Sequence, residues 1–478
     1  MKKTTFLLLF FCTFSFSQTP VAFYPTSDAS GIMFGTAVDI SGTDIAVSSG
    51  WNFATGPTSM GKVYVFSNDG TLSQVNDFYP EDAPGNDAYG LKISISNNFL
   101  AIGSLVHDLP VSNCGAVYVH RKVNGIWQSN YQKITAPDAS ANDHFGSYVK
   151  VVGNLLFVSA TEEESETSQP DVNSGAVYVY KFNGTEWAFS QKLTATNTEF
   201  GVHQFGSKIE TDGNRVMIAS NNGNVTGYNF IYLYEINNDN VVFQNSIGPL
   251  GNLEFIIKDF TLANDQIYFV AFGIPGIMDN FNGVNIMSEN EGNWILSGGF
   301  NVAQSDQIFS KIVVSGDNVF LGSDTYILAM ERKFPLLHYR LNGETWNLQN
   351  TFYSGGPSAS DDFFGSVLAV SGNNLLIGAP QEGTFSAGKA YIFDVTLGTS
   401  KFDKAGVSVY PNPTADKLFV KASGKDIEKA EVYSVTGKLL LTQENPTELS
   451  LQNLATGMYL VKLTSAEGQN QTFKIIKN

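Results

Sequence analysis

The sequence predicts an all-β protein, a seven-bladed β-propeller followed by a small Ig-like β-sandwich. An aromatic residue, usually followed by glycine, recurs seven times at intervals of about 55 residues and opens a strand pattern each time. A repeat of this length indicates units that cannot bury their own face and must pack on their neighbours. The aromatic marks are Phe34-Gly35, Tyr89-Gly90, Phe145-Gly146, Phe205-Gly206, Phe255-Ile256, Phe309-Ser310 and Phe364-Gly365.

The third repeat predicts four antiparallel strands, which make one propeller blade. After Phe145-Gly146, an alternating pattern is followed by the apolar run 155–160, as expected of a strand buried on both faces. Two further strand patterns, 176–182 and 187–195, flank Asn183-Gly184. An Asn-Gly pair between two strand patterns is a strong hairpin signal, because both central residues of that turn need positive φ.

The two ends of the repeat array predict a closed ring. The seventh repeat runs through 388–394 and lacks a fourth strand, whereas Phe23-Tyr24-Pro25 matches Phe78-Tyr79-Pro80 at the end of the first repeat. The N-terminal segment can therefore supply the missing strand and leave no open sheet edge. We expect the propeller to span residues 18–396.

The repeats resemble FG-GAP repeats in their bacterial, integrin-alpha-like form. The resemblance rests on the Lys-Ile/Leu-Thr-Ala segments 133–136 and 192–195, which lead to Phe-Gly, and on Gly378-Ala379-Pro380 in the last repeat. Integrin-type members carry a DxDxDG calcium loop, but the matching turns here are short, as at 152–154. Because calcium needs several oxygen ligands over a longer loop, we expect no metal and no cofactor.

Residues 407–478 form a different, lysine-rich module of short alternating strand patterns. Its four segments are 409–420 (VYPNPTADKLFV), 432–441 (VYSVTGKLLL), 454–463 (LATGMYLVKL) and 473–478 (FKIIKN). They resemble the type A C-terminal sorting domain of the type IX secretion system of Bacteroidetes. The resemblance implies that the type IX machinery is a partner and that the protein is secreted or attached to the outer-membrane surface. An ordinary appended Ig-like binding domain is the alternative.

The N-terminal residues 1–17 are predicted to be a secretory signal peptide, which would deliver the chain to the periplasm. Lys2 and Lys3 precede a short apolar run, and the expected cleavage point lies between Ser17 and Gln18. No other stretch approaches the length of a membrane-spanning helix, so we expect no transmembrane segment. Residues 397–406 are the expected linker, and we expect a monomer.

The charge of the chain argues against one class of partner. The formal net charge is −17, and the C-terminal module is rich in lysine, so the acidic residues concentrate in the repeats. A strongly negative body repels phosphate groups, so nucleic acid binding is not expected.

The sequence contains no recognisable catalytic motif. It has no HExxH, GxSxG or Walker sequence, and its five histidines are scattered. Cys114 fills the slot before a glycine that Ser174 and Ala387 fill in other repeats, so we expect a structural role for it. We therefore predict no catalytic and no metal-binding residue.

Acidic loops supply a candidate ligand face. In a four-stranded blade, the loop that leads into the first strand and the loop that joins the second and third strands open on the same side. These loops, together with one exposed aromatic candidate, give the predicted ligand-face residues Trp51, Asp87, Asp143, Glu162, Glu163, Glu164, Glu166, Asp171 and Asp362. The alternative is that these acids solvate the loops and cap their own backbone.

Two functional classes remain open from the sequence. The first is a secreted or cell-surface binding and adhesion protein without enzymatic activity, whose partner is an extracellular glycan or matrix protein. The second is an extracellular polysaccharide hydrolase or lyase that takes its acid and base from the same carboxylates. Fold analogy does not decide between them. We predict the first, non-enzymatic class.

Overall fold

The structure is a computed structural model that describes most of the 478-residue chain. The described residues are 20–25, 32–50, 61–69, 71–80, 82, 87–164, 174–195, 203–221, 230–248, 255–273, 283–302, 309–323, 335–354, 362–383, 387–395, 407–422, 427–434, 439–465 and 470–478. The predicted signal peptide, the cleavage point at Ser17 and Gln18, and the linker 397–406 lie outside them. The chain divides into one compact unit over Thr19–Phe393 and a second that contains the chain from Asp394 onward.

Among its described residues, the first unit contains seven four-stranded antiparallel sheets and no α-helix. Six sheets use consecutive strands: β2 (Phe34–Ser41), β3 (Asp44–Ser49), β4 (Lys62–Asn68), β5 (Leu72–Phe78); β6 (Tyr89–Ile95), β7 (Phe99–Ser104), β8 (Ala116–Val123), β9 (Ile126–Ile134); β10 (Phe145–Val152), β11 (Leu155–Ala160), β12 (Ala176–Phe182), β13 (Trp187–Leu193); β14 (His203–Thr211), β15 (Arg215–Asn221), β16 (Phe230–Asn237), β17 (Asn240–Ile247); β18 (Phe255–Ala263), β19 (Gln266–Gly273), β20 (Gly283–Asn290), β21 (Asn293–Asn301); β22 (Lys311–Ser315), β23 (Asn318–Gly322), β24 (Leu336–Asn342), β25 (Thr345–Phe352). The remaining sheet combines β26 (Val367–Ser371), β27 (Asn374–Ala379) and β28 (Lys389–Asp394) with β1 (Val21–Phe23). The prediction of an all-β, propeller-type fold is confirmed.

The core of each sheet follows from its sequence pattern. The second strands β3, β7 and β11 are buried at every residue, because both of their faces pack against neighbouring sheets. The aromatic mark of the third repeat, Phe145, is fully buried and packs edge-to-face on Tyr178, with 5.4 Å between ring centroids. Phe34 and Tyr64 repeat this pair in the first sheet at 5.5 Å. Phe145 also shares a core cluster with Val117 of the preceding sheet, and Phe34 shares one with Leu376 of the last sheet, so these two aromatic marks fill the space between adjacent sheets.

The glycine after an aromatic mark permits close contact with the preceding sheet. The Phe145 amide donates to the Cys114 carbonyl oxygen at 2.9 Å, which links β10 to the start of β8. Gly146 has a φ of 96°, and a side chain there would place its Cβ 2.7 Å from the Ala116 carbonyl oxygen. Only glycine fits both conditions. The Phe205 amide donates to Ser174 in the same way, so the slot predicted for Cys114 is a backbone contact point between sheets.

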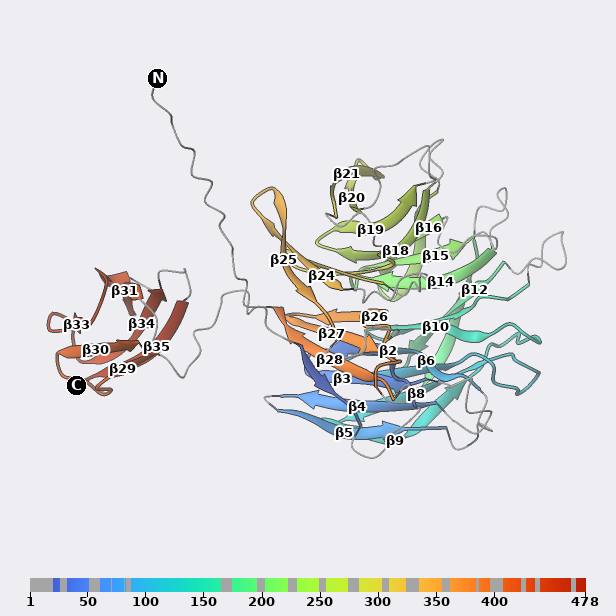
Figure 1. Cartoon of the computed structure of the whole chain (residues 1–478). Coiled ribbons are helices and arrows are strands. Elements are labelled where there is room, and N and C mark those ends of the chain that lie inside the picture. Colours follow the sequence, from blue (N-terminus) through green and yellow to red (C-terminus); the bar gives the residue numbers. More distant parts are fainter. Residues whose placement is uncertain are drawn as a thin grey trace, which may run out of the picture. The chain divides into compact units, whose positions relative to one another are not determined.

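The ring closes between the two ends of the repeat array. Strand β1 pairs antiparallel with β28, and β2 contacts β26 and β27. Figure 1 shows the blue strands β2 and β3 beside the orange strands β27 and β28. Because β1 supplies the fourth strand of the last sheet, the predicted role of the N-terminal segment is confirmed.

Polar side chains near the ring axis join the first strands of neighbouring sheets. The Asp39 carboxylate accepts a hydrogen bond from the Ile95 amide at 2.8 Å, and Asp259 accepts one from Ile312 at 2.9 Å. These amides lie on the free edge of a first strand. Each bond therefore satisfies a backbone N–H that has no partner in a neighbouring strand. Burial raises the pKa of Asp39, although nearby Lys150 opposes the effect.

The C-terminal unit contains two antiparallel sheets around one core. The three-stranded sheet has β29 (Val407–Tyr410), β30 (Lys417–Ala422) and β33 (Glu448–Ser450), and the four-stranded sheet has the order β32 (Leu439–Glu444), β31 (Ile427–Ser434), β34 (Gly457–Ser465), β35 (Asn470–Lys477). Leu418 and Leu449 of the first sheet pack with Val432, Val461 and Ile475 of the second. This arrangement agrees with the predicted small β domain.

Candidate ligand face

The loops that were predicted to share one side of the propeller contact each other. The Val106 amide lies 3.4 Å from the Asp87 carbonyl oxygen, and Glu162 makes the same contact with Asp143 at 3.3 Å. Both contacts join the loop leading into a first strand to the loop that joins the second and third strands. Gln381 contacts Asp362 equivalently at 3.3 Å in the last sheet. We call the surface formed by these loops the ligand face.

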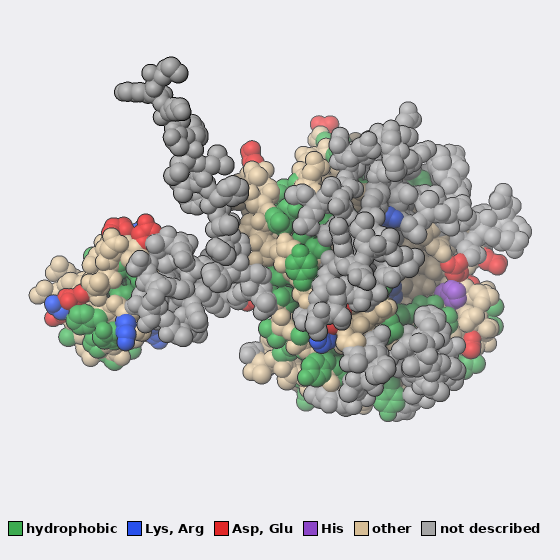
Figure 2. Space-filling model, in the orientation of Figure 1, with side chains coloured by type: hydrophobic (Ala, Val, Ile, Leu, Met, Phe, Trp, Pro, Cys, Tyr) green, Lys and Arg blue, Asp and Glu red, His purple; other side chains and the backbone are tan. Residues whose placement is uncertain are grey.

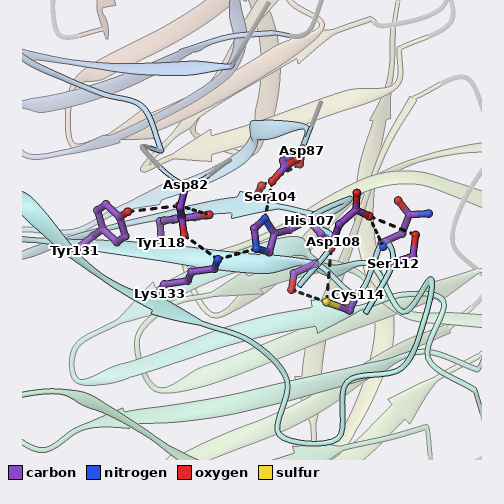
Figure 3. A network of polar contacts seen from close by, with 12 residues as sticks. Asp82, Asp87, Ser104, His107, Asp108, Ser112, Cys114, Tyr118, Tyr131 and Lys133 are labelled. Atoms are coloured by element: carbon purple, nitrogen blue, oxygen red, sulfur yellow. Dashed lines mark hydrogen bonds and ion pairs between the residues drawn. The ribbon is translucent and has the colours of Figure 1, made fainter. Parts of the chain in front are cut away.

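A chain of polar contacts links four side chains under this face in the second repeat (Figure 3). His107 is 1% exposed, and its Nδ1 lies 2.5 Å from the Asp87 carboxylate while its Nε2 lies 2.6 Å from Lys133 Nζ. A lysine ammonium can only donate, so Nε2 accepts and Nδ1 carries the proton that is donated to Asp87. Lys133 also donates to Asp82 at 2.9 Å. Both ends of this chain are carboxylates.

The outer end of the network is also well connected. Asp82 accepts a hydrogen bond from the Tyr118 hydroxyl at 3.0 Å as well as the one from Lys133. Partial burial opposes ionisation of Asp82, but these hydrogen bonds outweigh it and hold its pKa below the usual value. Burial and the Asp82 carboxylate raise the pKa of Tyr118 far above its usual range. Tyr118 therefore stays protonated as a donor.

The third repeat contains a similar network, in which another residue replaces His107, the central residue of the network in the second repeat. Glu163 takes the place of His107. The amide of each residue donates to the carbonyl oxygen of the residue three positions earlier. The carbonyl oxygen of each accepts a hydrogen bond from the amide of the glycine just before the third strand of its sheet. Lys192 donates to Glu163 at 2.6 Å and to Asp138 at 2.7 Å. Burial raises the pKa of Glu163, as does nearby Asp143, while the two carboxylates raise the pKa of Lys192 despite its burial. One lysine thus faces several carboxylates.

The last repeat compensates for its borrowed strand. In the second repeat, the cross-strand partner of Tyr118 is Lys133. The equivalent tyrosine of the last repeat, Tyr391, has Ala22 of β1 as its cross-strand partner, so no lysine stands at this position. Lys389 of β28 supplies the cation instead and donates to Glu382 at 2.8 Å. In all three repeats, a lysine therefore bonds the buried central residue of the network, which is His107, Glu163 or Glu382.

The predicted ligand-face residues fall into three groups. Asp87, Asp143 and Glu163 are buried, with exposed fractions of 5%, 1% and 9%. Glu162 and Asp362 are half-buried and accept hydrogen bonds from Gln204 and from the Phe364 amide, and Glu164 is exposed. Trp51, Glu166 and Asp171 lie outside the described residues.

Sequence reasoning missed the partners of these acids. It did not assign His107, Glu382 or the lysines to the network, although Lys133 and Lys192 stand in the Lys-Ile/Leu-Thr-Ala segments that mark the repeat. Aligning those lysines with the acidic loops would have provided the signal. The central residue varies between histidine and glutamate, so no single residue type identifies it.

The loop of the second repeat that joins β7 and β8 is held firmly on the ligand face. The Asp108 carboxylate accepts from the Asn113 amide at 2.9 Å, and the Asn113 side chain donates to Asn142 of the next repeat at 2.9 Å. This loop exposes Leu109 and Val111, with fractions of 62% and 37%. Apolar side chains on a fixed loop are available for contact with a ligand.

Several kinds of site are not found in the described part of the chain. Among those residues, no group of three or more His, Cys, Asp or Glu side chains is placed to hold a metal ion. Cys114 is buried and forms no disulfide. In the view of Figure 2, the lysine and arginine side chains of the described residues occur singly or in small groups. No helix within the described ranges is long and apolar enough to cross a membrane.

Comparison with known families defines the class of protein. A family model for the FG-GAP repeat matches residues 72–120, 128–180 and 354–393. A second family model, the secretion system C-terminal sorting domain, matches residues 408–478. The chain therefore carries FG-GAP repeats followed by a sorting domain of the type IX secretion system. This system exports the protein to the cell surface or the surrounding medium.

Two of the known proteins that are similar to this chain illustrate what the similarity supports. A structure of PorZ from Porphyromonas gingivalis, described as an essential bacterial surface component of the type-IX secretion system, matches with a TM-score of 0.51 and 12% identity. That match covers 95% of this chain and 61% of the PorZ chain, and at 12% identity it supports the fold alone. The ulvan lyase NLR42 from Nonlabens ulvanivorans is 29% identical over 87 residues, which are 17% of this chain and 16% of the lyase.

Proposed function

We propose that this protein is a non-enzymatic binding and adhesion propeller whose ligand face attaches to an extracellular glycan or matrix protein after type IX export. The observation that carries the proposal is the pairing of the buried acids under that face. Asp87 bonds His107, Glu163 bonds Lys192, and Glu382 bonds Lys389. These acids stabilise the loops.

The same pairing argues against catalysis by these carboxylates. A general acid or base must reach the substrate within hydrogen-bond distance. Asp87 and Asp143 are at most 5% exposed, so neither presents an oxygen to a polysaccharide bound outside. Glu163 has a raised pKa, as a general acid would, but its Oε1 is bonded to Lys192 and its Oε2 is buried.

The groups left for a ligand are suited to binding. Glu164 carries an exposed carboxylate that can accept hydrogen bonds from sugar hydroxyls or pair with basic side chains. Leu109 and Val111 add apolar contact on a loop fixed by side-chain hydrogen bonds. A preformed surface of this kind loses little conformational entropy on binding.

An extracellular polysaccharide hydrolase or lyase is the second candidate. The similarity to an ulvan lyase favours it, but that similarity spans only 17% of this chain. The partner of the proposed site would then be cut as well as bound. The two candidates differ in one measurable property, the length of the polysaccharide after incubation.

The test is a glycan and matrix-protein binding array with the purified full chain, compared with Glu164→Gln and Leu109→Ala variants. Glu186→Gln is the matched control, because Glu186 is exposed in the turn between β12 and β13, at the opposite end of the same sheet. We expect at least one ligand whose binding falls about tenfold in the ligand-face variants and is unchanged in the control. Equal binding by all four proteins would contradict the assignment of the ligand face.

A further inference from the structure

The outward face of the four-stranded sheet in the C-terminal unit divides into a polar half and an apolar half. In the polar half, Glu431 pairs with Lys429 at 2.9 Å and with Lys462 at 3.6 Å. Thr442 of the edge strand pairs with Glu431 and is exposed. This half has the charged, ion-paired character of an ordinary solvated surface.

The apolar half lies on the same four strands. Tyr433 is the cross-strand partner of both Leu439 and Leu460, and Met458 is the partner of Ile476 in the next row. Cross-strand partners share a face of the sheet, so these five side chains form one patch, which we call the sorting patch. Leu439, Met458 and Ile476 are 47%, 43% and 42% exposed. Single exposed apolar residues are common, but a contiguous group indicates an interaction surface.

The adjacent edge of the sheet is already occupied. The Asn412 side chain donates to the Lys474 carbonyl oxygen at 2.8 Å and accepts from the Ile476 amide at 2.9 Å. The Thr414 amide adds a bond to the Ile476 carbonyl oxygen at 2.8 Å. The chain itself therefore satisfies the edge of β35 there, so a partner cannot add a strand at that part of the edge.

We propose that the sorting patch is the surface by which the type IX export machinery recognises this chain. The partner it fits is a folded protein with an apolar surface and a carboxylate beside it, because exposed Lys474 pairs with Leu460 at the border of the patch. The match of the sorting-domain family to residues 408–478 assigns the export role to this unit, and the patch is its exposed apolar surface on the four-stranded sheet. This inference rests on export and is independent of what the propeller binds.

The test measures the export of the full chain in a type IX-competent bacterium, as the ratio of protein on the surface and in the medium to protein in the periplasm. Met458→Lys combined with Ile476→Lys places two charges in the patch and is expected to lower this ratio about tenfold. Lys474→Glu is expected to lower it in the same direction through charge alone. Thr442→Lys is the matched control, since it adds a lysine to the polar half of the same face, and it should export normally.

Folding and self-association are controlled separately. Each purified variant is compared with the parent by thermal unfolding, and Lys474→Glu keeps the test valid if the double variant fails to fold. Normal export of both Lys474→Glu and a folded double variant would overturn the proposal. A dimer of the parent that the double variant dissociates without any loss of export would also overturn it, because the patch would then serve self-association.

Discussion

The Phe34 amide donates a 3.0 Å hydrogen bond to the Ala387 carbonyl oxygen and so joins the first repeat to the last. The bond is equivalent to those that join Phe145 to Cys114 and Phe205 to Ser174 within the array. The contact between the ends of the array is therefore of the same kind as the contacts between consecutive sheets. Strand β1 adds a second connection by completing the last sheet.

Weakening β1 should destabilise the whole propeller. Phe23 is 7% exposed and its ring lies 4.9 Å from that of Phe66, so Phe23→Ala removes packing at the closure. We expect the free energy of unfolding to fall by about 3–5 kcal/mol, measured by chemical denaturation. Val21→Ala is the control, since Val21 is 61% exposed. Equal losses for the two variants would show that β1 does not close the ring.

The glycine after an aromatic mark should be far less replaceable than a turn glycine. Gly146 and Gly153 both have positive φ, 96° and 57°, but only Gly146 has a backbone atom in the way of a Cβ. We expect Gly146→Ala to lower the free energy of unfolding by at least about 3 kcal/mol and Gly153→Ala to lower it by about 1 kcal/mol. The cost at Gly153 is smaller because alanine there is disfavoured only by the positive φ. Thermal and denaturant unfolding of the two variants provide the comparison. Similar costs would remove the steric explanation of the mark.

The lysine of the third-repeat network should matter more than a surface lysine of the same sheet. Lys192→Met leaves Asp138 and Glu163 without their cation, and we expect a loss of about 2–4 kcal/mol. Lys181→Met removes an exposed pair with Asp239 and should cost less than about 1 kcal/mol. Denaturant unfolding at neutral pH measures both. Comparable small losses would mean that the network does not hold the loops.

Two buried histidines should make stability depend on pH. Burial lowers the pKa of His120 and of His338 to about 4, and their rings lie against Phe78 and Phe320. The unfolded chain binds these protons more tightly, so the contribution of these two histidines to stability is constant above about pH 6.5 and falls as the pH decreases towards 4. Each histidine contributes on the order of 2–3 kcal/mol to this fall. Unfolding of the parent and of His120→Leu between pH 4 and 7.5 tests this, and equal slopes would contradict it.

Local sequence patterns predicted the strands, the hairpins and the closure by residues 21–23, because a periodic pattern and a turn signal are properties of short segments. The same patterns placed Asp87, Asp143 and Glu163 in loops, where acidic residues are usually solvated. Asp87 is paired with His107 and Glu163 with Lys192, and both partners come from other segments of the chain. Pairing across segments is a tertiary property, which one sequence does not specify.

The central claim is that the ligand face binds an extracellular polymer without cutting it. The most direct measurement incubates the full chain with each polysaccharide it binds on the array and follows polymer length by size-exclusion chromatography. The account predicts a bound polymer of unchanged length. Shortening of the polymer that disappears in the Glu163→Gln variant would contradict the account and identify an enzyme.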